Sequence, residues 1–182
     1  MNLESSRKFK SFVEYVAQNC STCPKGKGKQ DTGYRAIMRR ADNPNLESIA
    51  WEHLVAWCDI ENPYLRKSFA LVGAAIARMD SPEKAPQGKA TVGKALQSLC
   101  NGKDAMEAKE REGRRLQRLI ACDSTLELLR VLRPVLQYLQ SKGCETLDYA
   151  GLLQDICYWD ERKRIKWIKD FYLKSEEDQK EA

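Results

Sequence analysis

One short stretch of the chain, YWDERKRIKWIKDFYL at residues 158–173, combines a high density of basic side chains with aromatic ones. Its cations are Arg162, Lys163, Arg164, Lys166 and Lys169. An arginine fork can bind two oxygens of one phosphate, which suits contact with a nucleic-acid backbone without reading of the bases. The chemistry to expect from this stretch is therefore binding of a polyanion.

A helical wheel separates the two kinds of side chain in this stretch. It places Ile165, Ile168, Phe171 and Tyr172 on one apolar stripe, with Arg162, Lys166 and Lys169 facing away and Lys163 on the flank. Trp159 precedes the expected helix cap Asp160, and Trp167 lies at the edge of the stripe. We therefore expect most of the aromatic rings in the core and the cations on an outward face.

Further basic sites are scattered along the chain. On one helix, Arg111, Arg114, Arg115 and Arg118 share one side, opposite Leu116, Leu119 and Ile120. Few of these cations have an acidic partner four residues away, although a solvated face is the usual role of such runs. The candidate backbone contacts are Arg39, Arg40, Lys94, Arg114, Arg115, Arg118, Arg133, Arg162, Lys163, Arg164 and Lys166. Among them, Arg40, Arg115 and Arg162 are the strongest candidates.

The composition neither requires nor excludes a polyanionic partner. The chain has 182 residues, a net charge of +5 and 31% charged residues, so the distribution of the charges has to decide. The pattern predicts no catalytic residue and no cofactor. The single histidine, His53, lies in a helical pattern beside Trp51 and Leu54, and the sequence contains neither GxSxG nor a Walker-type phosphate loop.

Cys20 and Cys23 form the sequence's CxxC pair. Zinc requires four ligands, and a second CxxC or an HxxxH is absent, so we predict no metal site and treat a thiol or metal protein as the weaker alternative. The chain has seven cysteines, most of them within apolar helical patterns, which is typical of buried thiols in a reducing cytoplasm. No run of about 18 apolar residues occurs, so no membrane contact is expected.

The pattern is helical almost throughout. Apolar residues recur at three- and four-residue spacing in 8–19, 46–58, 64–79, 90–100, 108–122, 125–140, 146–157 and 161–173. No segment shows sustained alternation, so the fold class is all-α. Asp123-Ser124 and Asp160 are expected N-caps, while Pro134 could kink or break its helix.

Two breaks interrupt the helical pattern. CSTCPKGKGKQDTG at 20–33 is expected to be a basic loop, and DSPEKAPQGK at 80–89 a Pro/Gly/Lys-rich linker. The second break predicts two small helical bundles, one in residues 1–86 and one in 87–182.

Four stretches occur in an order that resembles the CasB family, the small subunit of the type I-E CRISPR surveillance complex Cascade. They are YRAIMRRADNP (34–44), TVGKALQSL (91–99), GRRLQRLIACDST (113–125) and YWDERKRIKWIKDFYL (158–173). The resemblance implies an all-helical, non-catalytic cytoplasmic subunit of two bundles. It also implies partners: the subunits that coat the guide RNA, the large subunit, a second copy of the chain, single-stranded DNA and the guide RNA/target heteroduplex.

The resemblance also extends to single residues. It places the family's basic positions on Arg39, Arg40, Lys94, Arg114, Arg115, Arg162 and Arg164, and near Arg133. Ala121 and Ser124 stand where a relative can carry arginine. The function that this implies is stabilisation of the opened R-loop through the backbones of the target strand and the displaced strand. A free-standing helical RNA- or DNA-binding module is the alternative.

Overall fold

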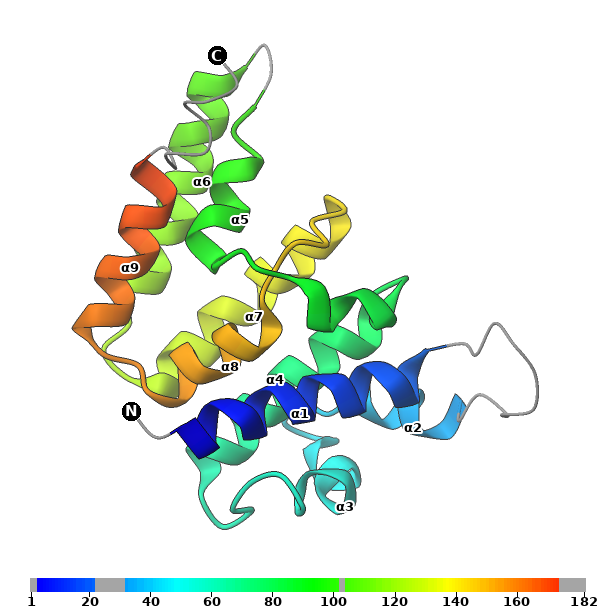
Figure 1. Ribbon diagram of the computed structural model, residues 1–182. Helices are drawn as coiled ribbons and strands as arrows, with labels where there is room; N and C mark the ends of the chain where they lie inside the picture. Colours follow the sequence, from blue (N-terminus) through cyan, green and yellow to red (C-terminus); the bar gives the residue numbers. More distant parts are fainter. Residues whose placement is uncertain (1–2, 22–31, 102–103, 174–182) are drawn as a thin grey trace.

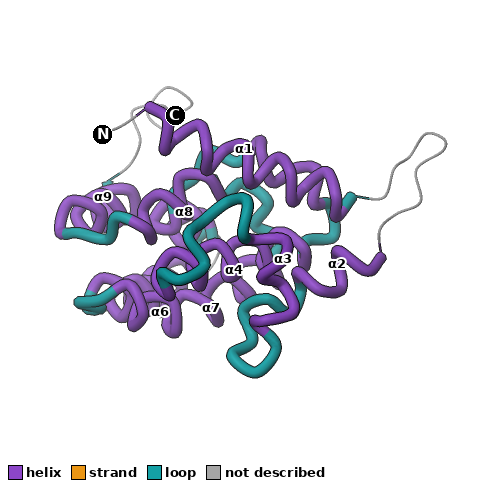
Figure 2. The backbone as a smooth tube through the Cα atoms, turned by 90° about the horizontal axis from the view of Figure 1, so that it is seen from below, coloured by secondary structure: helices purple, strands orange, loops and turns teal. Residues whose placement is uncertain are grey.

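The computed structural model of the chain describes residues 3–21, 32–101 and 104–173. The elements are α1 (Leu3–Cys20), α2 (Thr32–Met38), η1 (Glu47–Ala50), α3 (Trp51–Leu54), α4 (Pro63–Arg78), η2 (Pro82–Gln87), α5 (Val92–Ser98), α6 (Ala105–Ile120), α7 (Thr125–Ser141), α8 (Tyr149–Cys157) and α9 (Glu161–Tyr172). Figures 1 and 2 show helices and connecting loops throughout the described ranges, with no strand. The predicted all-α class is confirmed.

Helix α8 is the central element of the fold. It packs against α1, α4 and α7, while α5, α6 and α9 form a second group that stands together in Figure 1. Its buried residues Tyr149, Leu152, Leu153 and Ile156 follow the i, i+3, i+4, i+7 spacing of a single helix face. Because α7 contacts both α6 and α8, it connects the two groups of helices.

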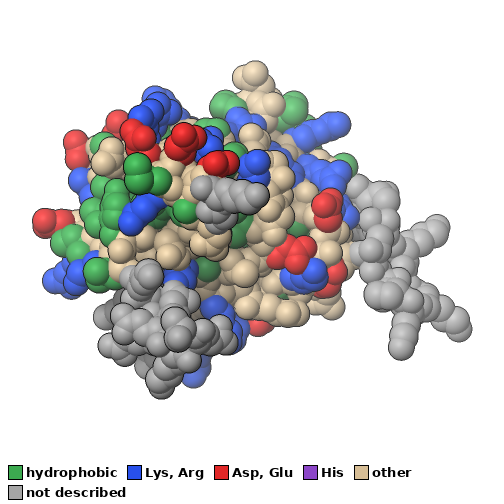
Figure 3. All heavy atoms as spheres, turned by 90° about the horizontal axis from the view of Figure 1, so that it is seen from above, with side chains coloured by type: hydrophobic (Ala, Val, Ile, Leu, Met, Phe, Trp, Pro, Cys, Tyr) green, Lys and Arg blue, Asp and Glu red, His purple; other side chains and the backbone are tan. Residues whose placement is uncertain are grey.

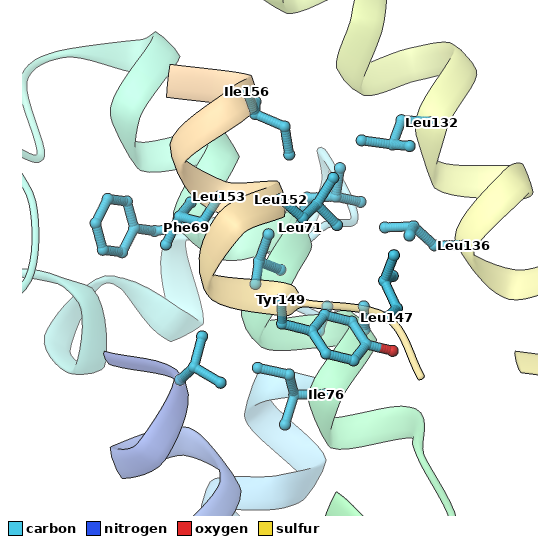
Figure 4. Close-up of a cluster of buried hydrophobic side chains, with 14 of the residues drawn as sticks. Phe69, Leu71, Ile76, Leu132, Leu136, Leu147, Tyr149, Leu152, Leu153 and Ile156 are labelled. Carbon is cyan, nitrogen blue, oxygen red and sulfur yellow. The ribbon is translucent and has the colours of Figure 1, made fainter. Parts of the chain in front are cut away.

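The core is built around the buried face of α8. Figure 4 shows these side chains between Phe69, Leu71 and Ile76 of α4 and Leu132 and Leu136 of α7. One hydrophobic cluster thus contains residues from both sides of the expected boundary at 86/87. The division into independent bundles stays a prediction.

The segment expected to be a linker, residues 80–89, is structured and well packed. Pro82 and Ala85 of η2 are buried, and η2 packs along α1. Beyond η2, the amides of Lys89 and Ala90 both donate to the carbonyl of Thr146 at 2.9 Å. These contacts attach the segment to both halves of the chain.

Local signals at two helix starts are confirmed. The hydroxyl of Ser124 accepts from the amide of Glu127 at 3.2 Å, and the carboxylate of Asp160 accepts from the amide of Lys163 at 2.9 Å. Both contacts satisfy an amide that the first helical turn leaves unpaired. Helix α7 continues through Pro134, so this proline does not end the helix.

The buried face of α9 differs from the predicted stripe. Ile165 and Tyr172 are 43% and 47% exposed, whereas Trp167 is 0% exposed and Phe171 is buried with it. The indole N–H of Trp167 donates to the buried carboxylate of Asp155 at 2.8 Å. Because the indole N–H is hydrogen-bonded there, Trp167 can occupy the centre of the buried face of α9. The helix is therefore rotated about its axis relative to the predicted stripe.

Candidate nucleic-acid interface

One of the predicted basic sites, Arg133, binds the carboxylate of Asp42, and Arg39 is joined to the same arrangement only through its backbone carbonyl. The carboxylate of Asp42 is 3% exposed and receives both Arg78 of α4 and Nε of Arg133 of α7, the latter at 3.0 Å. Arg78 also donates to the carbonyl of Arg39 at 2.7 Å. The fold therefore brings two arginines, one from α4 and one from α7, to one acidic group in the segment after α2.

The side chain of Arg39 is used by the fold. Its Nε donates to the carbonyl of Ala77 at 2.9 Å, next to a similar bond from Arg35 at 3.0 Å. Guanidinium groups at this position satisfy carbonyls that the last turn of α4 leaves unpaired, and they complement the helix dipole. Arg40, the next residue, is exposed, and within the described ranges its side chain has no hydrogen bond or ion pair.

On α6, a buried carboxylate organises two of the arginines. Glu112 is fully buried and accepts from the hydroxyl of Tyr138 at 2.8 Å and from Nε of Arg111 at 2.9 Å. Nε of Arg115 lies 3.6 Å from the same carboxylate, and its guanidinium stands 4.0 Å from the centre of the Tyr138 ring. Burial, with the Glu112 carboxylate beside the hydroxyl, raises the pKa of Tyr138.

The predicted outward face of α6 is therefore only partly free. Arg115 is half-buried and serves the contact between α6 and α7, while Leu116 is fully buried as predicted. Arg114 forms an ion pair with Glu110 along the exposed face. Arg118 is exposed, and its side chain has no partner among the residues that the structure describes.

Two lysines of α9 bind a second buried carboxylate, that of Asp155 on α8. Nζ of Lys163 and Nζ of Lys166 lie 2.9 and 3.5 Å from the carboxylate oxygens of Asp155, beside the indole of Trp167. Arg164 is half-buried and lies 3.3 Å from Asp123. These three cations link α9 to its neighbours.

The remaining basic positions on and near α9 differ in their surroundings. Arg162 is exposed and has no side-chain partner in the described part of the chain. Lys94 of α5 lines a cavity of about 310 Å³ with Lys89 and Lys169. The structure thus brings Lys94 and Lys169 together across the contact between α5 and α9.

Of the strongest candidates, Arg40 and Arg162 remain available for a ligand, and Arg118 joins them in place of Arg115. Figure 3 shows basic and acidic side chains interspersed over one face of the molecule. The i±4 spacing does not reveal these acidic partners, because Glu112 lies one and three residues from its arginines, and Asp42 and Asp155 lie on other elements. Burial of an acidic residue within an apolar pattern, such as Asp155 in LLQDIC, was the available signal.

The structure adds no support for a thiol or metal protein built on the cysteine pair. Cys20 is buried, and burial raises its pKa to about 11, while Cys23 lies outside the described residues. The described ranges contain no group of three or more His, Cys, Asp or Glu side chains that could hold a metal ion. In the same ranges, no helix has the length and apolar character needed to cross a membrane.

Comparison with protein families matches residues 34–172 to the family described as CRISPR-associated protein Cse2. The match begins within α2 and runs to the end of α9, and it includes all four stretches on which the resemblance to CasB depends except residue 173. Comparisons with curated proteins and with solved structures gave no significant match. The chain therefore belongs to the Cse2 family of CRISPR-associated proteins, which is the CasB family of type I-E Cascade.

Proposed function

We propose that the chain is a non-catalytic subunit of a type I-E Cascade complex that holds nucleic-acid backbones once the target duplex has opened. The observation that carries this proposal is that three of the predicted arginines, Arg40, Arg118 and Arg162, are exposed and have no side-chain partner among the described residues, in a member of the Cse2 family. Its ligands would be the phosphates of the target strand and of the displaced single strand.

The energetics of strand exchange favour such a role. Replacing a DNA duplex by an RNA–DNA heteroduplex is close to balanced, so modest contacts to the backbone can shift the equilibrium. Each neutralised phosphate contributes a slope of about −0.7 to the dependence of log K on log salt for single strands. Three arginines that each contact one phosphate would together contribute about −2.

The proposed partners are the subunits that coat the guide RNA, the large subunit and a second copy of the chain. With a net charge of only +5 and many cations paired internally, the isolated chain should bind DNA weakly. Inside the complex, the partners would hold it next to the strands, and the resulting effective concentration would strengthen the same contacts.

The test is binding of the purified chain to an unrelated single strand and to duplex DNA over a salt series. It is repeated with the guide-bound partner subunits added. We expect weak, salt-dependent binding alone and stabilisation of opened target DNA with the partners present. Tight binding that is indifferent to the partners would instead indicate a free-standing nucleic-acid module.

A matched pair of triple variants tests the named residues. Arg40→Ala, Arg118→Ala and Arg162→Ala together lower the net charge from +5 to +2, and so do Arg7→Ala, Lys8→Ala and Lys10→Ala on the exposed side of α1. We expect the first variant to lose most of the salt dependence and the second to keep most of it. If the two triple variants lost the same amount of salt dependence, DNA binding would depend on net charge alone, and the three arginines would not form a defined interface.

A further inference from the structure

A pocket of about 380 Å³ lies between α4, α7 and the segment after α2. Asp42 and its ion-pair partner Arg133 are among its lining residues. Its apolar lining is aliphatic and consists of Ala41, Pro44, Ala70, Leu71, Leu126 and Leu129. Its charged lining includes Lys67 of α4 and Arg130 and Arg133 of α7. The size lies at the lower end of the range of about 300–1,000 Å³ that is typical of ligand pockets.

The rim of this pocket carries an excess of positive charge. Its two carboxylates are already neutralised, Asp42 by Arg78 and Arg133, and Glu47 by Nε of Arg66 at 2.6 Å. Lys67 and Arg130 also line the pocket, and neither has an ion pair in the part of the chain that the structure describes. An occupant with negative charge beside an apolar group would complement both features.

A nucleobase fits this lining poorly. Each base edge carries several hydrogen-bonding groups, which lose free energy when they are buried without partners. The carboxylates that could read such groups are held by arginines, and no aromatic ring lines the pocket to stack on a base. An aliphatic or aromatic protein side chain has no such requirement, and acidic neighbours would meet Lys67 and Arg130.

We propose that this pocket is a docking site for a protein segment that inserts one apolar side chain between acidic residues. An apolar anchor surrounded by a charged rim is the arrangement in which a few residues provide most of the affinity of an interface. The rim charges would steer the segment and select against basic partners. None of the three exposed arginines of the proposed function lines this pocket, and the docking proposal does not depend on that function.

The probe for a test is the synthetic peptide acetyl-Glu-Glu-Leu-Glu-Glu-amide, titrated into the full chain with labelled leucine methyl groups. We expect saturable shifts at the methyl groups of Leu126 and Leu129. The same peptide with Ser in place of Leu should leave them unchanged. Absence of shifts up to millimolar peptide overturns the proposal, and so do equal shifts with the Ser peptide.

Variants separate the apolar contact from the charges. Leu126→Gln keeps the size of the side chain and should abolish the shifts at Leu129. Arg130→Glu with Lys67→Glu should weaken peptide binding at least about fivefold, whereas Arg118→Glu on α6 should have no effect. Thermal unfolding of each variant verifies that the fold is retained, and Arg130→Gln replaces the double reversal if that variant does not fold.

A single-stranded oligothymidylate provides the competing outcome. If it shifts the methyl groups of Leu126 and Leu129 and displaces the peptide, the pocket holds a nucleotide, and the protein-docking proposal is wrong. If the triple variant at Arg40, Arg118 and Arg162 loses DNA binding but keeps peptide binding, the two sites are distinct. The nucleic-acid proposal and the protein-docking proposal can therefore fail independently of each other.

Discussion

Arg133 and Asp42 form an ion pair in which 3.0 Å separates Nε of the arginine from Oδ2 of the aspartate. The two residues come from opposite sides of the boundary that the sequence predicts at 86/87. Arg78 of α4 binds the same carboxylate, which is almost fully buried. One acidic side chain thus ties α4 and α7 to the segment after α2, and two cations that could have met phosphate are committed to the fold.

Asp42→Asn should destabilise the protein. The substitution preserves the shape of the side chain but leaves Arg78 and Arg133 without a counter-charge. Breaking a fully buried pair costs about 3–5 kcal/mol. Because both arginines are partly exposed, we expect a loss of about 2 kcal/mol in the free energy of unfolding, measured by urea denaturation.

A double-mutant cycle with Arg133→Gln isolates the pair. If Arg133 and Asp42 interact, the loss in the free energy of unfolding of the double variant should be about 1 kcal/mol smaller than the sum of the losses of the two single variants. Strict additivity would mean that Arg133 and Asp42 do not interact in solution. In that case the two segments are held together by the apolar cluster alone.

Arg118→Ala and Arg115→Ala should separate binding from stability. Arg118 is exposed and has no partner in the described residues, so its loss should change the free energy of unfolding by no more than about 0.5 kcal/mol. It should make the salt slope for single-stranded DNA shallower by about 0.7. Fluorescence anisotropy over a salt series measures this slope.

Arg115→Ala should behave in the opposite way. It removes a guanidinium that stacks on Tyr138 and lies beside the buried carboxylate of Glu112. We expect a loss of about 1–2 kcal/mol in the free energy of unfolding. If instead Arg115→Ala leaves stability unchanged and weakens DNA binding as much as Arg118→Ala does, the side chain is free in solution to meet phosphate.

The sequence predicted the longer helices and two of their starts, because those depend on local rules, but α2 and η2 lie outside the predicted helical segments. Period-3.6 spacing predicted the helices, and Ser124 and Asp160 marked two of their starts correctly. The buried face of α9 was wrong in part because the centre of that face is set by Asp155, which lies on another helix. A helical wheel contains no information about such a partner.

The same limit applies to the candidate interface. Charge partners were sought within one helix, yet Arg133 binds Asp42 across α7 and the segment after α2, and Lys163 binds Asp155 across α9 and α8. Arg114, by contrast, has the i, i+4 partner that a helix face reveals. Composition and spacing could therefore predict where the cations lie along the chain, but not which of them the fold would use.

Stability should fall at high pH because partly buried Cys157 resists ionisation. Burial raises its pKa from 9.0 to about 12, so the unfolded chain loses this proton first as the pH rises above 9. The stabilisation is complete below pH 9 and is lost between pH 9 and 12. Between pH 8 and 10, we expect Cys157 to account for about 1 kcal/mol of the decrease.

Cys157→Ser provides the reference for this effect. The variant has nearly the same size and no group that ionises in this range. With reducing agent present, its free energy of unfolding should fall by about 1 kcal/mol less than that of the wild type between pH 8 and 10. Identical decreases in the two proteins would show that the thiol ionises equally in both states, and hence that it is not buried.

Gly93→Ala should disrupt the contact between α5 and α9. A Cβ atom at Gly93 would lie 2.1 Å from the carbonyl oxygen of Trp167, and backbone cannot give way as a flexible side chain can. The indole of Trp167 is in addition held by Asp155. Alanine is more favourable than glycine in a helix by about 1 kcal/mol. Overpacking should outweigh this and lower the free energy of unfolding, measured by urea denaturation, by about 2 kcal/mol.

Gly113→Ala on α6 is the matched control, since it makes the same chemical change in another buried helix position. Its Cβ would meet the hydroxyl of Tyr172 at 3.2 Å, at the end of an exposed side chain that can move aside. We expect unchanged or slightly higher stability, because the helix preference of alanine is then the larger effect. If both variants lost about 2 kcal/mol, close approach at Gly93 would not be the cause, and α5 and α9 would have to be farther apart than their contact at Trp167 implies.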